Sequence, residues 1–378
     1  MIPLSVPNIS GNEWKYIKEC LDTNWVSSVG SYVSRFEKIV AEFCGVKHAI
    51  ATSNGTAALH VSLLLSGVRQ GDFVIVPNIT FVAPVNAIRY LGADPVLIDI
   101  DQYGWQLDLD LLSDFLQKET RQTASGCTHS KSGRRISAIM PVHVLGNICE
   151  MGRLLMIAEN FGIPIIEDAT EALGSYYNEK HAGSFGKFGC LSFNGNKIIT
   201  TGGGGMILTD DDGLAKHAKH ITTQAKSRPD EYFHDEVGYN YRLVNILAAM
   251  GVAQMEQLPQ FLKNKKEVAS KYDEAFKDIK GFRPQQITRR VNANHWLYTA
   301  RVSDQARLRG HLWDNGLEVR PFWVPMNQLP AFEQNIYYHQ DDLSDQVYLS
   351  CLSLPCSTGI TEVETDTVIR LVKEFFHD

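Results

Sequence analysis

Short apolar runs rich in β-branched residues alternate with amphipathic stretches through the first two-thirds of the chain. The runs have the length and composition of buried strands, and the stretches between them repeat their apolar residues at helical spacing. We expect strands at residues 48–52, 73–77, 95–100, 136–142, 164–167, 186–193 and 205–209, and helices at 56–65, 83–91 and 151–161. This alternation predicts an α/β fold with a mostly parallel sheet covered on both faces by helices.

The pattern changes after the last of these strands. Between residues 243 and 276 the apolar positions fall roughly on one side of a helix, and Pro259 is expected to kink or divide it. A shorter α+β pattern then runs to the end of the chain. We therefore predict a large domain at residues 1–250 and a smaller C-terminal α+β domain at residues 251–378.

Residues 118–135 differ from both patterns, because they contain no apolar run. The segment gathers five basic side chains, which are Lys118, Arg121, Lys131, Arg134 and Arg135. A solvated, mobile loop is the default interpretation, and an electrostatic lure for an anionic ligand is the alternative.

Charge and composition narrow the class of protein. The 378 residues carry 36 Lys and Arg against 43 Asp and Glu, a formal net charge of −7. This balance argues against a nucleic-acid partner or a polybasic membrane binder. No apolar run is long enough to span a membrane and the start resembles no signal peptide, so we expect a cytoplasmic protein without a membrane partner. The seven Cys are scattered without a Cys-x-x-Cys pair, which predicts free thiols and no metal site.

A candidate phosphate site follows the first predicted strand. The segment Ser53-Asn54-Gly55-Thr56 opens a helix, where free backbone N–H groups, a Gly that permits close approach and a Thr hydroxyl suit a phosphate. The alternative is an ordinary helix cap, because Ser, Asn and Thr are also the preferred capping residues.

Two further candidates stand at the carboxyl ends of later strands, where open α/β sheets build their ligand crevices. Phe81 offers a ring that can stack on a planar ligand, unless it belongs to the core. Asp168 follows the strand at 164–167 and can pair with a protonated heteroaromatic nitrogen. Its alternative role is that of a helix cap.

Lys197 lies on a turn between two short strands, followed by the glycine run Gly202–Gly205. A Lys is usually a solvated surface residue, but this position beside a Gly-rich backbone suits an amine that forms imines. Ser192 offers a second phosphate hydroxyl. A nucleotide loop is a weak reading of the glycines, because neither G-x-G-x-x-G before a helix nor G-x-x-x-x-G-K-[ST] occurs there.

In this order and at these intervals, the motifs NGTAAL, TFVA, EDATEA and SFNGNKIITTGGGG strongly resemble the DegT-like nucleotide-sugar aminotransferases. These are enzymes dependent on pyridoxal 5'-phosphate (PLP) with the aspartate-aminotransferase fold, known as fold type I. The resemblance covers nearly the whole chain, including the segments WVSSVG at 25–30, PVHVLG at 141–146 and GYNYRL at 238–243.

The resemblance implies a role for each matching position. Lys197 would hold PLP covalently through its amine, and Asp168 would pair with the pyridine nitrogen. Phe81 would stack on the ring. The residues expected to bind the phosphate are Gly55, Thr56 and Ser192.

The resemblance also implies a role in the active site for Glu171 and a role between subunits for Asn245. Glu171 stands where relatives often have Gln or His, so it would contact the ring hydroxyl or the substrate. Asn245 resembles a phosphate contact that reaches in from the neighbouring subunit, which implies a homodimer with shared active sites. Some relatives carry His in place of the lysine and catalyse dehydration, so Lys197 favours transamination.

The resemblance also predicts the substrates. The donor is expected to be L-glutamate and the acceptor a nucleotide-linked 4-keto-6-deoxy sugar, for surface-polysaccharide amino-sugar synthesis. The segments NWVSSVGSYVSRFE (24–37) and KSRP (226–229) look most like the bacillosamine and legionaminic acid branch, whose acceptor is UDP-2-acetamido-4-keto-2,6-dideoxyhexose. GDP-4-keto-6-deoxymannose or a keto sugar acid is the alternative acceptor.

Candidate acceptor contacts come from several segments, and each has a structural alternative. We name Trp25, His143, Lys226, Arg228, Tyr239, His295 and Arg320. Aromatic packing, a surface ion pair or a satisfied core histidine would account for them equally.

The sequence argues against two other classes of protein. A PLP-binding regulator would need an effector segment such as a DNA-binding domain, and the family-like pattern begins within the first residues. A dinucleotide-dependent sugar oxidoreductase would need G-x-G-x-x-G after its first strand, which this sequence lacks.

Overall fold

The computed structural model describes residues 1–228 and 230–377. Pro229, the last residue of the KSRP segment, lies outside the described residues. Within the described ranges, no helix combines the length and the apolar composition needed to cross a bilayer.

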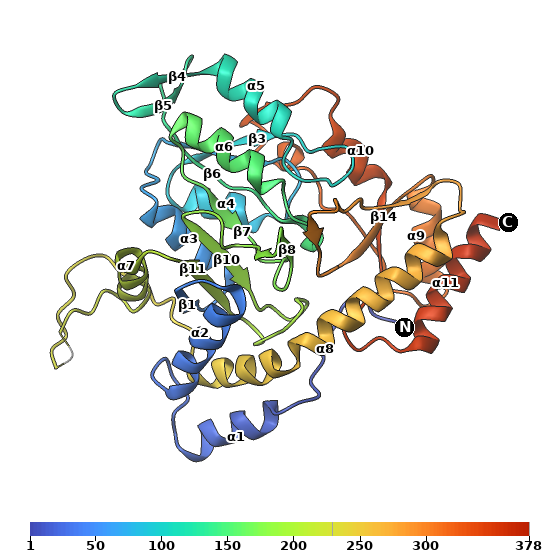
Figure 1. Cartoon of the computed structure of the whole chain (residues 1–378), viewed down its shortest axis with the longest axis horizontal. Helices are drawn as coiled ribbons and strands as arrows, with labels where there is room; N and C mark the ends of the chain where they lie inside the picture. The colour runs from blue at the N-terminus through green and yellow to red at the C-terminus, as the bar shows by residue number, and fades with distance from the viewer. Residues whose placement is uncertain (229, 378) are drawn as a thin grey trace.

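A large, mostly parallel sheet forms the centre of the molecule (Figure 1). One group of four hydrogen-bonded strands contains, in order, β16 (Ile336–Tyr338), β3 (Asp94–Ile98), β2 (Phe73–Pro77) and β6 (Ile136–Ile139). The second group of four strands contains, in order, β7 (Ile166–Asp168), β10 (Phe188–Ser192), β11 (Gly205–Thr209) and β1 (His48–Thr52). Parallel bridges from Ile139 to Ile165 and from Val142 to Asp168 join the two groups of strands. Strand β11 runs antiparallel to both of its neighbours, β1 and β10.

Helices share one core with this sheet, and three of them match the helices predicted at 56–65, 83–91 and 151–161. The helices are α2 (Ser31–Cys44), α3 (Gly55–Leu65), α4 (Ala83–Tyr90), α5 (Leu109–Glu119), α6 (Met151–Phe161) and α7 (Asp212–Thr222), with the short 3₁₀ helix η1 (Val144–Gly146). The predicted α/β class with a mostly parallel sheet is therefore confirmed, and β1, β2, β11 and α6 have the predicted bounds.

One long helix, α8 (Asn245–Phe276), connects the two parts of the molecule (Figure 1). Its first half packs against α1 (Glu13–Asp22) and α2. It contains Pro259 and continues past it as one helix, so of the two predicted outcomes the division is wrong and the kink stays a prediction. Its last turns, from Val268 to Phe276, contribute to a second hydrophobic cluster.

The second cluster lies under a small sheet and its helices. The strands are β12 (Phe282–Pro284), β14 (Tyr298–Val302), β17 (Cys351–Leu354) and β15 (Arg320–Pro321), and the helices are α9 (Gln305–Asp314), α10 (Leu343–Ser350) and α11 (Glu362–His377). Shorter elements complete the chain, namely β8 (Tyr176–Tyr177), β9 (Lys180–His181), β13 (Val291–Asn292) and η2 (Met326–Gln328). Strand β16 and Trp296 nevertheless pack with the large core, so the boundary at residue 250 stays a prediction.

The basic segment 118–135 is a hairpin rather than a loop. Strands β4 (Thr120–Thr123) and β5 (Gly126–His129) pair antiparallel, and Cys127 to His129 are buried. Four of its five cations pair with carboxylates, in the pairs Lys118–Asp114, Lys131–Glu119, Arg134–Asp94 and Arg135–Asp72. Its charge is therefore largely neutralised locally, which leaves little to attract an anion.

Candidate active site

The predicted phosphate residues meet where β7 and β10 end beside the start of α3. Asp168 ends β7 and Ser192 ends β10, and these two parallel strands are neighbours in the sheet. A Cβ at Gly55 would lie 2.9 Å from the Ser192 Cβ and 3.2 Å from Cγ2 of Thr170. Only a glycine therefore allows the first turn of α3 to approach the strand ends so closely.

The capping interpretation of this helix start is confirmed at Asn54, and the phosphate site stays a prediction. The side chain of Asn54 accepts a hydrogen bond from the Ala57 N–H at 2.8 Å. The cap thus occupies Asn54 and leaves the N–H groups of Gly55 and Thr56 at the positive end of the helix, where an anion is favoured.

Lys197 lies on the turn after β10, and its side chain is 13% exposed. Its Nζ lies 3.6 Å from Oε1 of Glu171 and 4.0 Å from the ring centroid of Trp296. The indole of Trp296 donates a hydrogen bond to the Asn196 carbonyl at 2.7 Å, so it also fixes the turn that carries the lysine. Trp296 was missed by the sequence analysis, because a Trp beside a strand looks like any core aromatic.

Two buried carboxylates accompany the lysine. Asp168 accepts a hydrogen bond from the Thr170 N–H at 3.1 Å, and burial raises its pKa against the opposing effects of Thr170 and Lys197. Glu171 accepts one from the Leu145 N–H at 2.8 Å. Burial raises the pKa of Glu171 to about 7, although the Lys197 charge opposes the rise.

The backbone that holds Glu171 adopts an uncommon conformation. Leu145 has a φ of 63°, in the left-handed region that non-glycine residues rarely occupy. This conformation aims its N–H at the Glu171 carboxylate. Such backbone conformations gather at functional sites, where the surrounding structure enforces them.

Phe81 and His143 lie in opposite environments. Phe81 stands just before α4 with 54% of its surface exposed, so its ring is open to a stacking partner. His143 is completely buried, with Nε2 at 3.0 Å from Oε2 of Glu167 and Nδ1 at 3.4 Å from the Cys149 N–H. Its environment fits the alternative of a satisfied core histidine, and its contact with substrate stays a prediction.

The remaining acceptor candidates have polar or aromatic neighbours of their own. Arg228 pairs with Glu231 at 2.7 Å, and Arg320 pairs with Glu318 at 2.8 Å. Other contacts are Lys226 over the ring of Tyr232, Tyr239 stacked on Tyr241, and His295 in a groove with Lys266 and Asp273. Burial lowers the pKa of His295 to about 4. The contact of these residues with the acceptor stays a prediction.

Trp25 and Asn245 belong to one local arrangement. The Asn245 amide donates a hydrogen bond to the Trp25 carbonyl at 2.7 Å and accepts one from the Tyr32 N–H at 3.0 Å. The amide therefore fastens the 25–32 segment to the start of α8 within its own subunit. The Trp25 ring remains more than half exposed.

The site fits a phosphorylated heteroaromatic aldehyde. Asp168 is a buried carboxylate that makes no ion pair with any described side chain, so a protonated ring nitrogen would complete it. The start of α3 with Gly55 and Ser192 suits the phosphate, and Lys197 suits the aldehyde. The fold and this set of groups define a PLP-dependent transferase.

Comparison with known proteins identifies the family. The model of the DegT/DnrJ/EryC1/StrS aminotransferase family matches residues 7–373. The chain belongs to this family, and it is a PLP-dependent sugar aminotransferase.

Individual relatives are similar to this chain over nearly their full length. The chain is 36% identical to a GDP-perosamine synthase of Escherichia coli O157:H7, covering 100% of this chain and 99% of that one. It is 38% identical to a GDP-perosamine synthase of Caulobacter vibrioides, covering 99% and 98%. A DegT DnrJ EryC1 StrS aminotransferase from Brucella abortus superposes with a TM-score of 0.90 at 26% identity, covering 97% and 96%. The expected family is thus confirmed, whereas these relatives do not support the bacillosamine and legionaminic acid branch in particular.

Proposed function

We propose that this enzyme transfers the amino group of L-glutamate to GDP-4-keto-6-deoxymannose, giving a GDP-linked 4-amino sugar for surface polysaccharide. The observation that carries the reaction type is the Lys197 amine, held 3.6 Å from Glu171 in the same buried site as Asp168. The choice of acceptor rests on two relatives named GDP-perosamine synthases, at 36% and 38% identity over nearly the whole chain. They favour the GDP-sugar alternative over the UDP-acetamido sugar expected first.

Each residue of the site has a distinct part in this proposal. PLP, when bound, supplies an electron sink for the bond broken at the donor α-carbon. Asp168 would hold the ring nitrogen in its protonated form through a charge-assisted hydrogen bond, which would strengthen that sink. The Lys197 Nζ would take the proton from the donor α-carbon as a base and later give it up as an acid.

Glu171 is placed to exchange protons with Lys197. Its Oε1 lies 3.6 Å from the Lys197 Nζ, and burial raises its pKa to about 7. A carboxyl group with this pKa changes protonation near neutral pH, so it can hold a proton or release it at little cost. Trp296 covers the lysine on its other side and limits the approach of water.

We further propose that two chains form a homodimer with shared active sites. The segment after α7, with Lys226 and Arg228, projects from the body of the molecule (Figure 1). Tyr232 on this segment is 96% exposed, and Trp25 and Phe81 are also exposed. These features suit a surface completed by a second subunit, on which the basic residues would meet the pyrophosphate of the acceptor. Light scattering on the active enzyme tests this, and an active monomer would contradict it.

A glutamate-dependent amination assay tests the acceptor. The panel contains GDP-4-keto-6-deoxymannose, UDP-2-acetamido-4-keto-2,6-dideoxyhexose, a dTDP-linked 4-keto-6-deoxy sugar and a free keto sugar acid. We expect the GDP sugar to have the highest kcat/KM, by about tenfold or more, because the nucleotide and the sugar configuration are both read by fixed contacts. Faster amination of the UDP sugar would reject the proposed acceptor, and no amination of any would reject the reaction.

A further inference from the structure

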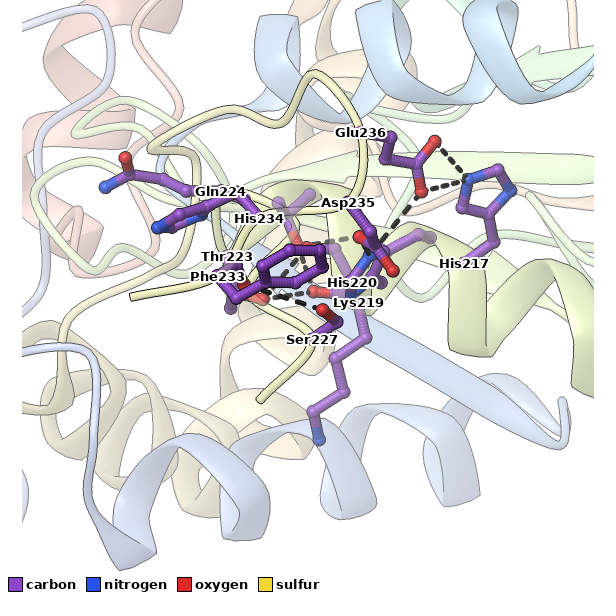
Figure 2. Close-up of polar contacts among 12 residues, drawn as sticks. His217, Lys219, His220, Thr223, Gln224, Ser227, Phe233, His234, Asp235 and Glu236 are labelled. Carbon is purple, nitrogen blue, oxygen red and sulfur yellow. Dashed lines mark hydrogen bonds and ion pairs between the residues drawn. The ribbon is translucent and has the colours of Figure 1, made fainter. Parts of the chain in front are cut away.

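Side chains that can bind a metal gather beside α7, on residues 217–236. Figure 2 shows two imidazoles from one turn of α7 facing two carboxylates from the segment that follows it. We refer to His217, His220, Asp235 and Glu236 together as the α7 cluster. No proposed step of the aminotransferase reaction uses any of them.

His220, Asp235 and Glu236 offer ligand atoms that all lie within 4.8 Å of one another, and His217 is joined to them through Glu236. His220 Nε2 lies 2.7 Å from Oδ1 of Asp235 and 3.6 Å from Oε1 of Glu236. His217 Nε2 lies 2.8 Å and 3.1 Å from the two Glu236 oxygens. Donors around a tetrahedral zinc ion with bonds of about 2.0–2.1 Å are about 3.3 Å apart, so small side-chain adjustments would admit the ion.

The charge of the α7 cluster also suits a divalent cation. Two neutral imidazoles and two carboxylates carry a formal charge of −2. The nearby Lys219 does not compensate it, because its amine points away from the α7 cluster (Figure 2) and lies 3.7 Å from Oε2 of Glu37. Two nitrogen and two oxygen donors in this arrangement match zinc better than the all-oxygen sets preferred by calcium and magnesium.

The backbone holds the two halves of the α7 cluster in register. The Asp235 N–H donates to the Ala225 carbonyl at 3.3 Å, and isolated bridges pair Thr223 with Asn240 and Lys226 with His234. Gln224 and Ala225 have φ values of 63° and 52°, so the chain makes a sharp left-handed turn just after α7. This turn returns the segment so that its carboxylates face the helix.

We propose that the α7 cluster binds one zinc ion, which fastens the segment 223–240 to α7. A metal bridging two segments stabilises their folded arrangement by its binding free energy, because it binds that arrangement and not the opened one. The segment carries Lys226 and Arg228, so zinc would set how firmly these candidate acceptor contacts are held.

Isothermal titration calorimetry of zinc into chelator-treated holoenzyme tests the site. We expect one zinc per chain, and binding weakened by about tenfold or more in His220→Ala and in Asp235→Asn. The matched control is His48→Ala. His48 forms a similar pair with Asp212 at the other end of α7, at 2.7 Å, but without further donors. Wild-type affinity in His220→Ala, or no zinc binding by the unmodified enzyme, would overturn the proposal.

Limited proteolysis tests the fastening role by itself. Chymotrypsin can cleave after Tyr232, which is almost fully exposed in the single chain, and any cover from a second subunit is the same with and without zinc. We expect zinc to slow this cleavage by about threefold or more in the unmodified enzyme and in His48→Ala, but not in His220→Ala. Circular dichroism checks that the variants are folded. Equal cleavage with and without zinc would show that the ion does not hold the segment.

Discussion

The Lys197 site and the α7 cluster both combine nitrogen bases with carboxylates, yet the pKa of a carboxyl group is raised in the first and lowered in the second. At the Lys197 site the closest charged contact is 3.6 Å, but the groups are buried and the pKa of Glu171 rises to about 7. In the α7 cluster His220 lies 2.7 Å from Asp235, and its hydrogen bond lowers the pKa of that exposed carboxyl. At the Lys197 site desolvation by burial outweighs the neighbouring charge, whereas at the exposed Asp235 the hydrogen bond from His220 sets the direction of the pKa shift.

The largest expected effect follows from removing the buried amine. Lys197→Ala should reduce turnover on the order of 10³-fold or more, because it removes both the covalent attachment of PLP and the proton-transfer group. After treatment of this variant with borohydride, mass spectrometry should detect no cofactor covalently attached to the chain. The control is Lys187→Ala, an exposed lysine just before β10, which should behave as the unmodified enzyme. A Lys197→Ala enzyme with normal turnover would exclude this lysine from the chemistry.

A smaller effect is expected in the pH dependence of stability. The folded-state pKa of Glu171, about 7, lies above its ordinary value of 4.5. The stability contributed by its protonated form is therefore present below pH 4.5 and lost as the pH rises through 7. Relative to Glu171→Gln, the cofactor-free protein should lose up to about 3 kcal/mol between pH 4.5 and 8.

Thermal unfolding of both proteins across this pH range measures the effect. The control is Glu159→Gln, which changes an exposed carboxyl group on α6 and should show no such trend. A constant difference between the wild-type protein and Glu171→Gln would mean that Glu171 is already ionised at pH 5.

The smallest effect is expected in the α7 cluster without zinc. His220→Ala should then shift the midpoint of thermal unfolding by no more than about 2 °C, because exposed ion pairs contribute little. His48→Ala should do the same, and differential scanning calorimetry with a chelator present compares the two. A much larger shift in His220→Ala alone would show that the α7 cluster is an important stabilising network in the absence of metal.

Local patterns predicted much of the fold. The runs at residues 48–52, 73–77 and 205–209 became β1, β2 and β11, because buried strands of a covered sheet must be apolar over their whole length. The hairpin at β4 and β5 was missed for the converse reason. One of its strands is largely solvated, so its sequence resembles a polar loop.

The candidate site was predictable in part. The family-like motifs identified Lys197, Asp168 and Gly55, which the fold brings to neighbouring strand and helix ends. Trp296 left no signal, because its position over Lys197 depends on how the small sheet packs against the large one. His143 was expected near substrate, but its burial against Glu167 could not be read from a single histidine in a loop.

The sequence alone determined the alternation of strands and helices, because it depends on local spacing, and its resemblance to the aminotransferase family implied the cofactor and predicted Lys197 as the residue that holds it. The tertiary structure decided the raised pKa of Glu171, the cover over Lys197 and the convergence of the α7 cluster. These properties arise from solvent exclusion and from contacts between separate segments. Neither is encoded at any single position, so both appear only when the chain is folded.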